Sequence, residues 1–92
     1  MSIVVRFAPP FATAEQYDEA VGRLEAQGDY PPDGLDYHVC FLVHGNIRVS
    51  EIWDSREQFE AFGDTLMPIL SDVGIEFSAD PEVFEVQNIV KR

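Results

Sequence analysis

The stretch that decides the fold is RVSEIWDSREQFEAF, which runs from Arg48 to Phe62. Its first part, up to Trp53, alternates apolar and polar residues with the period of two that is typical of a β-strand. Its second part opens with S-R-E-Q, in which Ser55 and Gln58 have the spacing of a helix capping box. The stretch therefore predicts a strand that passes directly into a helix, with the single tryptophan of the chain at the junction.

The residues before this stretch predict a strand and a helix. Residues 2–7 are mostly apolar and β-branched, which favours a strand. In T-A-E-Q, Thr13 and Gln16 again have capping-box spacing, and an apolar stripe at helical spacing follows over residues 17–24. Gly28 is a natural C-terminal stop for this helix.

The remaining segments predict a hairpin, the rest of the second helix and a final strand. Residues 35–43 and 47–53 flank the turn sequence H-G-N, so we expect them to pair as a hairpin. Pro68 predicts a kink or an early end of the second helix. Residues 71–81 are expected to be irregular, and residues 82–90 to form the last strand.

The order of these elements, β-α-β-β-α-β, predicts an α+β fold of the ferredoxin-like type. In this plait, a four-stranded antiparallel sheet carries two helices on one face. The length of 92 residues corresponds to one domain, so we expect a single domain over residues 1–92.

The strands are apolar on both faces, although the helices cover only one. In the second strand, Tyr37, Val39, Phe41 and Val43 alternate with His38, Cys40, Leu42 and His44, and neither row is charged. At ~25 cal/mol per Å², leaving such a face in water costs several kcal/mol, comparable to the stability of a small domain. We therefore expect a homodimer that packs its sheets face to face. The alternative is a monomer with a mildly apolar face.

Composition and charge exclude several classes of partner. The 17 acidic against 6 basic residues give a net charge of −11, which disfavours nucleic acids and anionic membrane surfaces. The single cysteine, Cys40, cannot form an internal disulfide, the N-terminus does not resemble a signal peptide, and no apolar run spans a bilayer. We therefore expect a cytoplasmic protein. The motifs of nucleotide-binding loops, serine hydrolases and zinc peptidases are absent.

Glu51 and Trp53 are the first candidates for a functional site, because a period of two places them on one strand face. A carboxylate among apolar neighbours is desolvated, and this is how a general base near neutral pH is made. The alternative for Glu51 is a salt bridge with Arg6 or Arg48. Trp53 can stack on a planar ligand, or it can simply pack in the core under the second helix.

His38 is the second candidate for acid–base work or for a hydrogen bond to a ligand. The alternative is a histidine in the dimer interface. His38, Cys40 and His44 have the same strand parity, but no further ligand accompanies this H-x-C pattern. We therefore predict no metal site.

The quoted stretch, written E-x-W-D-S-R-E-Q-F-E-A, together with the plait order, resembles the dimeric α/β-barrel superfamily and in particular antibiotic-biosynthesis-monooxygenase-like domains. The matching residues are Glu51, Trp53, Ser55, Glu57, Phe59 and Ala61. The resemblance implies a dimeric barrel and, for some members, oxygenation of polycyclic aromatic substrates without a cofactor.

The sequence departs from this family at one position. Phe62 stands where many members carry a histidine. The haem-degrading branch of the family relies on a helix histidine and on an asparagine in the first strand, and this chain has Arg6 and Phe7 in the first strand. Haem degradation is therefore not expected.

The resulting hypothesis is a small dimeric protein that binds, and transforms without a cofactor, a small planar or apolar metabolite between sheet and helices. Glu51 and His38 would be the catalytic residues. The substrate-binding residues would be Trp53, Tyr17, Arg6 and Phe62. Such a site requires a cleft of roughly a few hundred Å³. The alternative is a non-catalytic module that acts through dimerisation or partner binding, and the missing helix histidine favours it.

Overall fold

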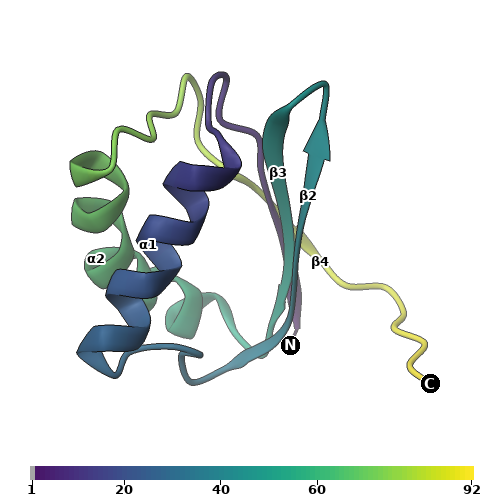
Figure 1. The fold of residues 1–92 in the computed structure, drawn as a ribbon. Helices are drawn as coiled ribbons and strands as arrows, with labels where there is room; N and C mark the ends of the chain where they lie inside the picture. The colour runs from purple at the N-terminus through teal and green to yellow at the C-terminus, as the bar shows by residue number, and fades with distance from the viewer. Residues whose placement is uncertain (1) are drawn as a thin grey trace.

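The computed structural model describes residues 2–92 and forms a two-layer α+β plait. In chain order its elements are β1 (Ile3–Phe7), α1 (Ala14–Gln27), β2 (Leu35–Val43), β3 (Asn46–Trp53), α2 (Arg56–Asp72) and β4 (Glu82–Glu85). The strands pair antiparallel in the order β2-β3-β1-β4, and both helices lie on the same face of the sheet (Figure 1). The predicted ferredoxin-like fold is confirmed. No helix within residues 2–92 is long and apolar enough to cross a membrane.

The helix α1 begins and ends where its local signals predict. The Thr13 hydroxyl oxygen accepts the Gln16 backbone N–H at 3.2 Å, and the Gln16 side-chain oxygen accepts the Thr13 N–H at 2.9 Å. This reciprocal pair is the capping box. Gly28 ends the helix in the left-handed region at φ 80°, a conformation that glycine adopts without steric cost.

The helix α2 differs from its prediction at both ends. Ser55 caps it, but the Gln58 side chain accepts from the Ser55 hydroxyl instead of the Ser55 backbone, so the capping box is only half formed. Of the two outcomes predicted at Pro68, the early end is wrong, because the helix continues to Asp72, and the kink stays a prediction. The residues that follow the proline, Ile69 and Leu70, are buried in the core. Pro68 has no backbone N–H and cannot donate a helical hydrogen bond, and the packing of Ile69 and Leu70 offsets this loss.

The last strand is shorter than predicted and covers Glu82–Glu85 instead of residues 82–90. Its partner β1 pairs with it only from Arg6 back to Ile3, and the Val86 N–H then bonds the Ser2 carbonyl oxygen at 3.1 Å. The ladder ends there because the neighbouring strand ends. Residues 86–92, which we call the C-terminal arm, leave the sheet on the side opposite to the helices (Figure 1).

The core lies between the sheet and the two helices. Along β3 the residues that face the helices are buried and the alternate residues are half-buried. Trp53 is fully buried with Ile3 and Val5, and its ring lies 5.8 Å from that of Phe59 and 5.7 Å from that of Phe62. The tryptophan therefore closes the space between the end of β3 and α2.

The other face of the sheet has no covering layer in the described part of the chain. Its apolar side chains include Tyr37, Phe41 and Val43 of β2 and Phe84 of β4, which are between 37 and 52% exposed. Arg6 and Ser50 lie among them. We call this surface the open face.

Removing the Thr13 cap tests the local basis of α1. Thr13→Ala should lower the free energy of unfolding by about 1 kcal/mol, because the Gln16 backbone N–H loses its capping partner. The measurement is urea unfolding followed by circular dichroism. Ser78→Ala, between α2 and β4, is the control and should leave the unfolding midpoint unchanged. Equal midpoints for the wild type and Thr13→Ala would contradict the assignment.

Candidate functional site

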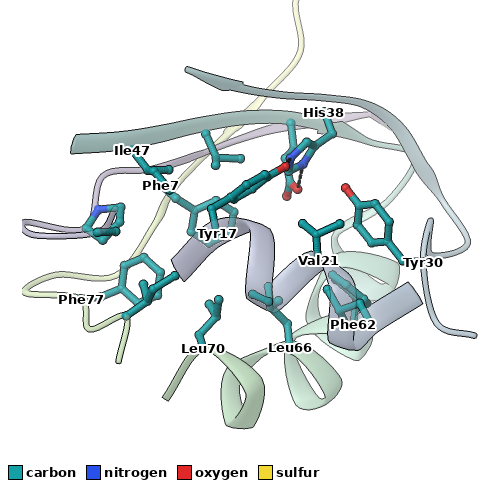
Figure 2. A pocket seen from close by; sticks show the side chains of 17 residues that line it. Phe7, Tyr17, Val21, Tyr30, His38, Ile47, Phe62, Leu66, Leu70 and Phe77 are labelled. Atoms are coloured by element: carbon teal, nitrogen blue, oxygen red, sulfur yellow. Dashed lines mark hydrogen bonds and ion pairs between the residues drawn. The ribbon is translucent and has the colours of Figure 1, made fainter. Parts of the chain in front are cut away.

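A cavity lies between the sheet and the two helices, lined almost entirely by apolar side chains (Figure 2). Phe7, Leu66, Leu70 and Phe77 belong to this apolar wall. Of the lining residues only Tyr17, Tyr30, His38 and Glu51 carry polar side-chain atoms. The cavity is therefore an apolar space with one polar end.

The cavity is smaller than the cleft expected from the sequence. The cavity has a volume of about 70 Å³, whereas ligand sites span roughly 300–1,000 Å³. Phe62 and Leu66 of α2 fill part of the space from one side, and Tyr17 of α1 fills it from another. A ligand larger than a single ring therefore requires these side chains to move.

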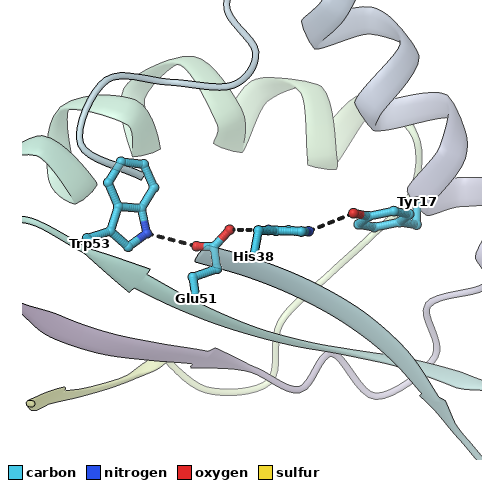
Figure 3. Close-up of polar contacts among 4 residues, drawn as sticks. All are labelled: Tyr17, His38, Glu51 and Trp53. Atoms are coloured by element: carbon cyan, nitrogen blue, oxygen red, sulfur yellow. Dashed lines mark hydrogen bonds and ion pairs between the residues drawn. The ribbon is translucent and has the colours of Figure 1, made fainter. Parts of the chain in front are cut away.

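A line of four hydrogen-bonded side chains forms the polar end (Figure 3). The Trp53 indole N–H donates to Glu51 Oε1 at 3.0 Å, and Glu51 Oε2 lies 2.6 Å from His38 Nδ1. His38 Nε2 lies 2.6 Å from the Tyr17 hydroxyl oxygen. We call these four residues the polar chain.

Sheet register and one helix bring the polar chain together. His38 of β2 is directly opposite Glu51 of β3, so both side chains point to the same face. Trp53 follows Glu51 by two residues and shares that face. Tyr17 comes from α1, and its ring lies end to end with the His38 imidazole, nearly parallel to it, at 5.9 Å between ring centres (Figure 3).

The chemistry of the carboxylate sets the direction of its hydrogen bond with His38. An ionised carboxylate only accepts hydrogen bonds, so His38 Nδ1–H donates to Glu51. In the neutral imidazole, Nε2 carries no proton and accepts the hydrogen of the Tyr17 hydroxyl. A hydroxyl, an imidazole and a carboxylate in this order form an arrangement that can pass a proton from the hydroxyl to the imidazole, as in catalytic triads.

Glu51 is the one buried charged residue within residues 2–92, with 6% of its surface exposed. Both carboxylate oxygens receive an N–H donor, which offsets the loss of hydration. The alternative salt bridges with arginine are not formed. Arg6 approaches Glu82 at 4.0 Å, and Arg48 donates to the Pro9 and Ile47 carbonyl oxygens.

The structure brings together four of the six residues that the sequence singled out. Glu51, His38, Tyr17 and Phe62 line the cavity. Trp53 lies behind Glu51, outside the lining, and contacts the lining residues Glu51 and Phe62. Arg6 lies on the open face, because Val5 is the β1 residue paired with Glu51 and Arg6 points the opposite way.

Tyr30 is a lining residue that the sequence did not single out. It comes from the loop between α1 and β2, and its ring meets the His38 ring edge-on at 6.2 Å. A residue inside D-Y-P-P-D-G has no periodic pattern, so no sequence signal points to it. Within residues 2–92, no group of three or more histidine, cysteine or acidic side chains is arranged to hold a metal ion.

Both cavity tyrosines resist ionisation. Burial raises the pKa of Tyr17 well above its ordinary value, and the nearby Tyr30, Cys40 and Glu51 add to the shift. Burial also raises the pKa of Tyr30, with a further contribution from the Glu51 charge. Both hydroxyls are therefore protonated at neutral pH and act as hydrogen-bonding groups.

These raised pKa values predict a loss of stability in alkali. In the unfolded chain the tyrosines ionise near pH 10.0, whereas in the folded protein they keep their protons to higher pH. The free energy of unfolding should therefore fall as the pH rises above about 10. Urea unfolding at several alkaline pH values measures this decline. The fall of the free energy of unfolding with pH should be shallower in Tyr17→Phe and Tyr30→Phe. If both variants lose stability with pH as steeply as the wild type, the burial of these phenols is contradicted.

Comparison with known proteins gives a fold relationship without a sequence relationship. No protein-family model and no curated protein sequence matches the chain. A mutant form of SnoaB, a cofactor-independent oxygenase from Streptomyces nogalater, superposes with a TM-score of 0.62 at 16% identity, covering 99% of this chain and 96% of that one.

Two further solved structures have the same architecture. A protein from Deinococcus radiodurans assigned as an antibiotic biosynthesis monooxygenase gives a TM-score of 0.57 at 16% identity, over 100% of this chain and 98% of that one. Rv0793 from Mycobacterium tuberculosis gives 0.51 at 14% identity, over 98% and 95%. The protein therefore has the fold of the antibiotic-biosynthesis-monooxygenase-like proteins, as its sequence resemblance implied.

Proposed function

We propose that the cavity binds a small apolar ring that carries an ionisable hydroxyl, and that the polar chain accepts the proton of this hydroxyl. The observation that carries the proposal is a hydroxyl, imidazole and carboxylate in hydrogen-bonded sequence at the one polar end of an apolar cavity. The apolar wall would hold the ring, and the polar chain would orient the hydroxyl.

The proton would move in two coupled steps. The ligand hydroxyl donates to the Tyr17 oxygen, whose own hydrogen is already directed at His38 Nε2. When the ligand proton transfers to Tyr17, the Tyr17 proton transfers to His38. The product is a ligand anion and an imidazolium, and the Glu51 carboxylate stabilises this imidazolium. The Trp53 N–H holds Glu51 in place and acts as a positioning group.

A ligand anion in an apolar cavity is suited to reaction with dioxygen. In cofactor-independent monooxygenation the substrate supplies both reducing electrons, one oxygen atom enters the product and the other leaves as water. SnoaB is described as a cofactor-independent oxygenase, and its likeness to this chain supports the same reaction class here. The small cavity favours a single ring over the polycyclic substrates that the family resemblance suggested.

A chromogenic phenol tests the proton transfer directly. We expect 4-nitrophenol to bind the wild-type protein and to display its phenolate absorption at a pH where the free dye is mostly protonated, because the polar chain takes up the proton. His38→Asn should bind the dye in its protonated form. His44→Asn is the matched control, since this second histidine is exposed in the β2–β3 turn, and it should behave as the wild type.

Two results would contradict the proton-transfer proposal. One is binding of the dye by the wild type without the phenolate band, and the other is an undiminished band in His38→Asn. Trp53 emission reports binding independently of the dye's ionisation, because the chain has one tryptophan and its ring packs against Phe62 of the cavity wall. Toluene, which lacks the hydroxyl, should change this emission less than phenol at equal concentration.

We further propose that a second copy of the chain covers the open face and closes the dimeric barrel. Tyr37, Phe41 and Phe84 leave apolar surface exposed there, a cost of roughly 25 cal/mol per Å² that a partner would remove. The C-terminal arm supports the same inference. Lys91 of the arm bonds both carboxylate oxygens of Asp36 on β2 at 2.8 and 2.9 Å, although β4 lies at the opposite edge of the sheet.

The C-terminal arm crosses the open face without packing closely against it. The space between them is about 830 Å³ and is lined in part by Val4, Tyr37 and Ile52. The sheet side of this space is apolar, whereas the arm adds polar and charged side chains such as Gln87 and Asn88. An open space of this size beneath a tethered segment is suited to side chains of a partner, because residues 2–92 offer nothing to fill it. The C-terminal arm would then contact the second copy of the chain.

Sedimentation velocity tests the dimer. The wild type should sediment at twice the chain mass of 10.4 kDa at micromolar concentration. Phe41→Glu should shift it to the monomer, because a carboxylate would be buried unpaired in the interface. Phe11→Glu is the matched control, since Phe11 is 85% exposed in the loop before α1, and its neighbour Ala12 lines the cavity on the helix side of the sheet. A wild-type particle of single-chain mass would overturn the proposal.

A non-catalytic dimerising or partner-binding module is the second candidate. The observation that favours it is the small volume of the cavity, together with a polar chain whose members already satisfy one another. The dye experiment separates the two candidates. A protein that dimerises but leaves the absorption of 4-nitrophenol and the emission of Trp53 unchanged is a module of this second kind.

A further inference from the structure

We propose that Tyr30 supplies a second hydroxyl to the cavity, and that Tyr17 and Tyr30 together select a ring bearing two oxygen atoms on adjacent carbons. This inference rests on the function proposed above and narrows its ligand to the catechol type. It assigns a specificity role to Tyr30, which the proton pathway does not use.

The two tyrosines approach the same imidazole from different elements. Tyr17 of α1 points its hydroxyl end at the His38 ring, with an angle of 20° between the planes, and Tyr30 of the α1–β2 loop meets the His38 ring edge-on at 90°. Both rings line the cavity, and both hydroxyls lie at its polar end (Figure 2). The two phenols are near enough for each to influence the ionisation of the other.

The two hydroxyls play different hydrogen-bonding roles towards a ligand, because Tyr17 accepts a hydrogen bond and Tyr30 donates one. Tyr17 commits its hydrogen to His38 Nε2, so towards the cavity it presents only oxygen lone pairs. Tyr30 is outside the short line of bonds that joins Tyr17, His38, Glu51 and Trp53. Tyr30 also lies within hydrogen-bonding reach of Tyr17. Its O–H can rotate about the C–O bond from that partner to a ligand oxygen. The polar end thus presents one acceptor beside one donor.

A ring with two adjacent oxygens matches this pair. One ligand hydroxyl donates to the Tyr17 oxygen and enters the proton pathway. The neighbouring oxygen accepts the Tyr30 O–H, which stays protonated because the phenol is half-buried beside the Glu51 charge. After the proton transfer, the same bond stabilises the negative charge shared over the two ligand oxygens. The remainder of the ring contacts only the apolar wall.

Binding of three small phenols to three proteins tests the role of Tyr30. Catechol, resorcinol and phenol are titrated into the wild type, Tyr30→Phe and Tyr37→Phe, with Trp53 emission excited at the red edge of the protein absorption as the readout. We expect the wild type to bind catechol several-fold more tightly than phenol or resorcinol. Resorcinol has the same two hydroxyls on non-adjacent carbons and controls for their number.

Tyr30→Phe should lose the preference for catechol and keep the wild-type affinity for phenol. Tyr37→Phe should keep the preference, because Tyr37 lies on the open face. Near-ultraviolet circular dichroism checks that Tyr30→Phe retains its packing. The role of Tyr30 is overturned if Tyr30→Phe still prefers catechol, or if the wild type binds phenol without preferring catechol. Either result leaves the proposed function standing. Failure of all three phenols to bind the wild type overturns the proposed function together with the role of Tyr30.

Discussion

The burial of one carboxylate is the constraint on which the rest of the site depends. Glu51 is removed from water, and a charge in that position requires a donor for each oxygen. The donors are the Trp53 indole and the His38 imidazole. Satisfying this one group therefore fixes the orientation of the tryptophan at the end of β3 and the tautomer of the histidine on β2, and the histidine in turn orients Tyr17 of α1.

The small size of the chain shapes both faces of its sheet. Two helices supply enough side chains to bury one face, where they leave a cavity beside the polar chain. Residues 2–92 form no third layer for the other face, so Tyr37, Phe41 and Phe84 stay exposed. The proposed site and the proposed dimer interface consequently lie on opposite faces of the same strands. His38 of β2 belongs to the proposed site, and its neighbour Tyr37 belongs to the proposed dimer interface.

Local signals predicted the elements well where the cause is itself local. The Thr13 cap, the Gly28 stop and the β2–β3 hairpin depend on residues a few positions apart, and each was predicted correctly. The early end at Pro68, one of two outcomes predicted there, and the extension of β4 to residue 90 both failed, and in each case a distant residue decides. The helix α2 continues through Pro68 because Ile69 and Leu70 find a core to pack in, and β4 stops at Glu85 because β1 offers no further partner. The sequence of α2 does not show the core in which it packs, and the sequence of β4 does not show where β1 ends.

The sequence by itself determined the plait and the pairing of Glu51 with Trp53 on one strand face, because a strand alternates its side chains with a fixed period of two. Only the tertiary structure decided which further residues join them. The register placed His38 opposite Glu51 and turned Arg6 to the open face, and the packing of α1 and its following loop brought Tyr17 and Tyr30 to the imidazole. These contacts join positions far apart in the chain, and no local pattern encodes them.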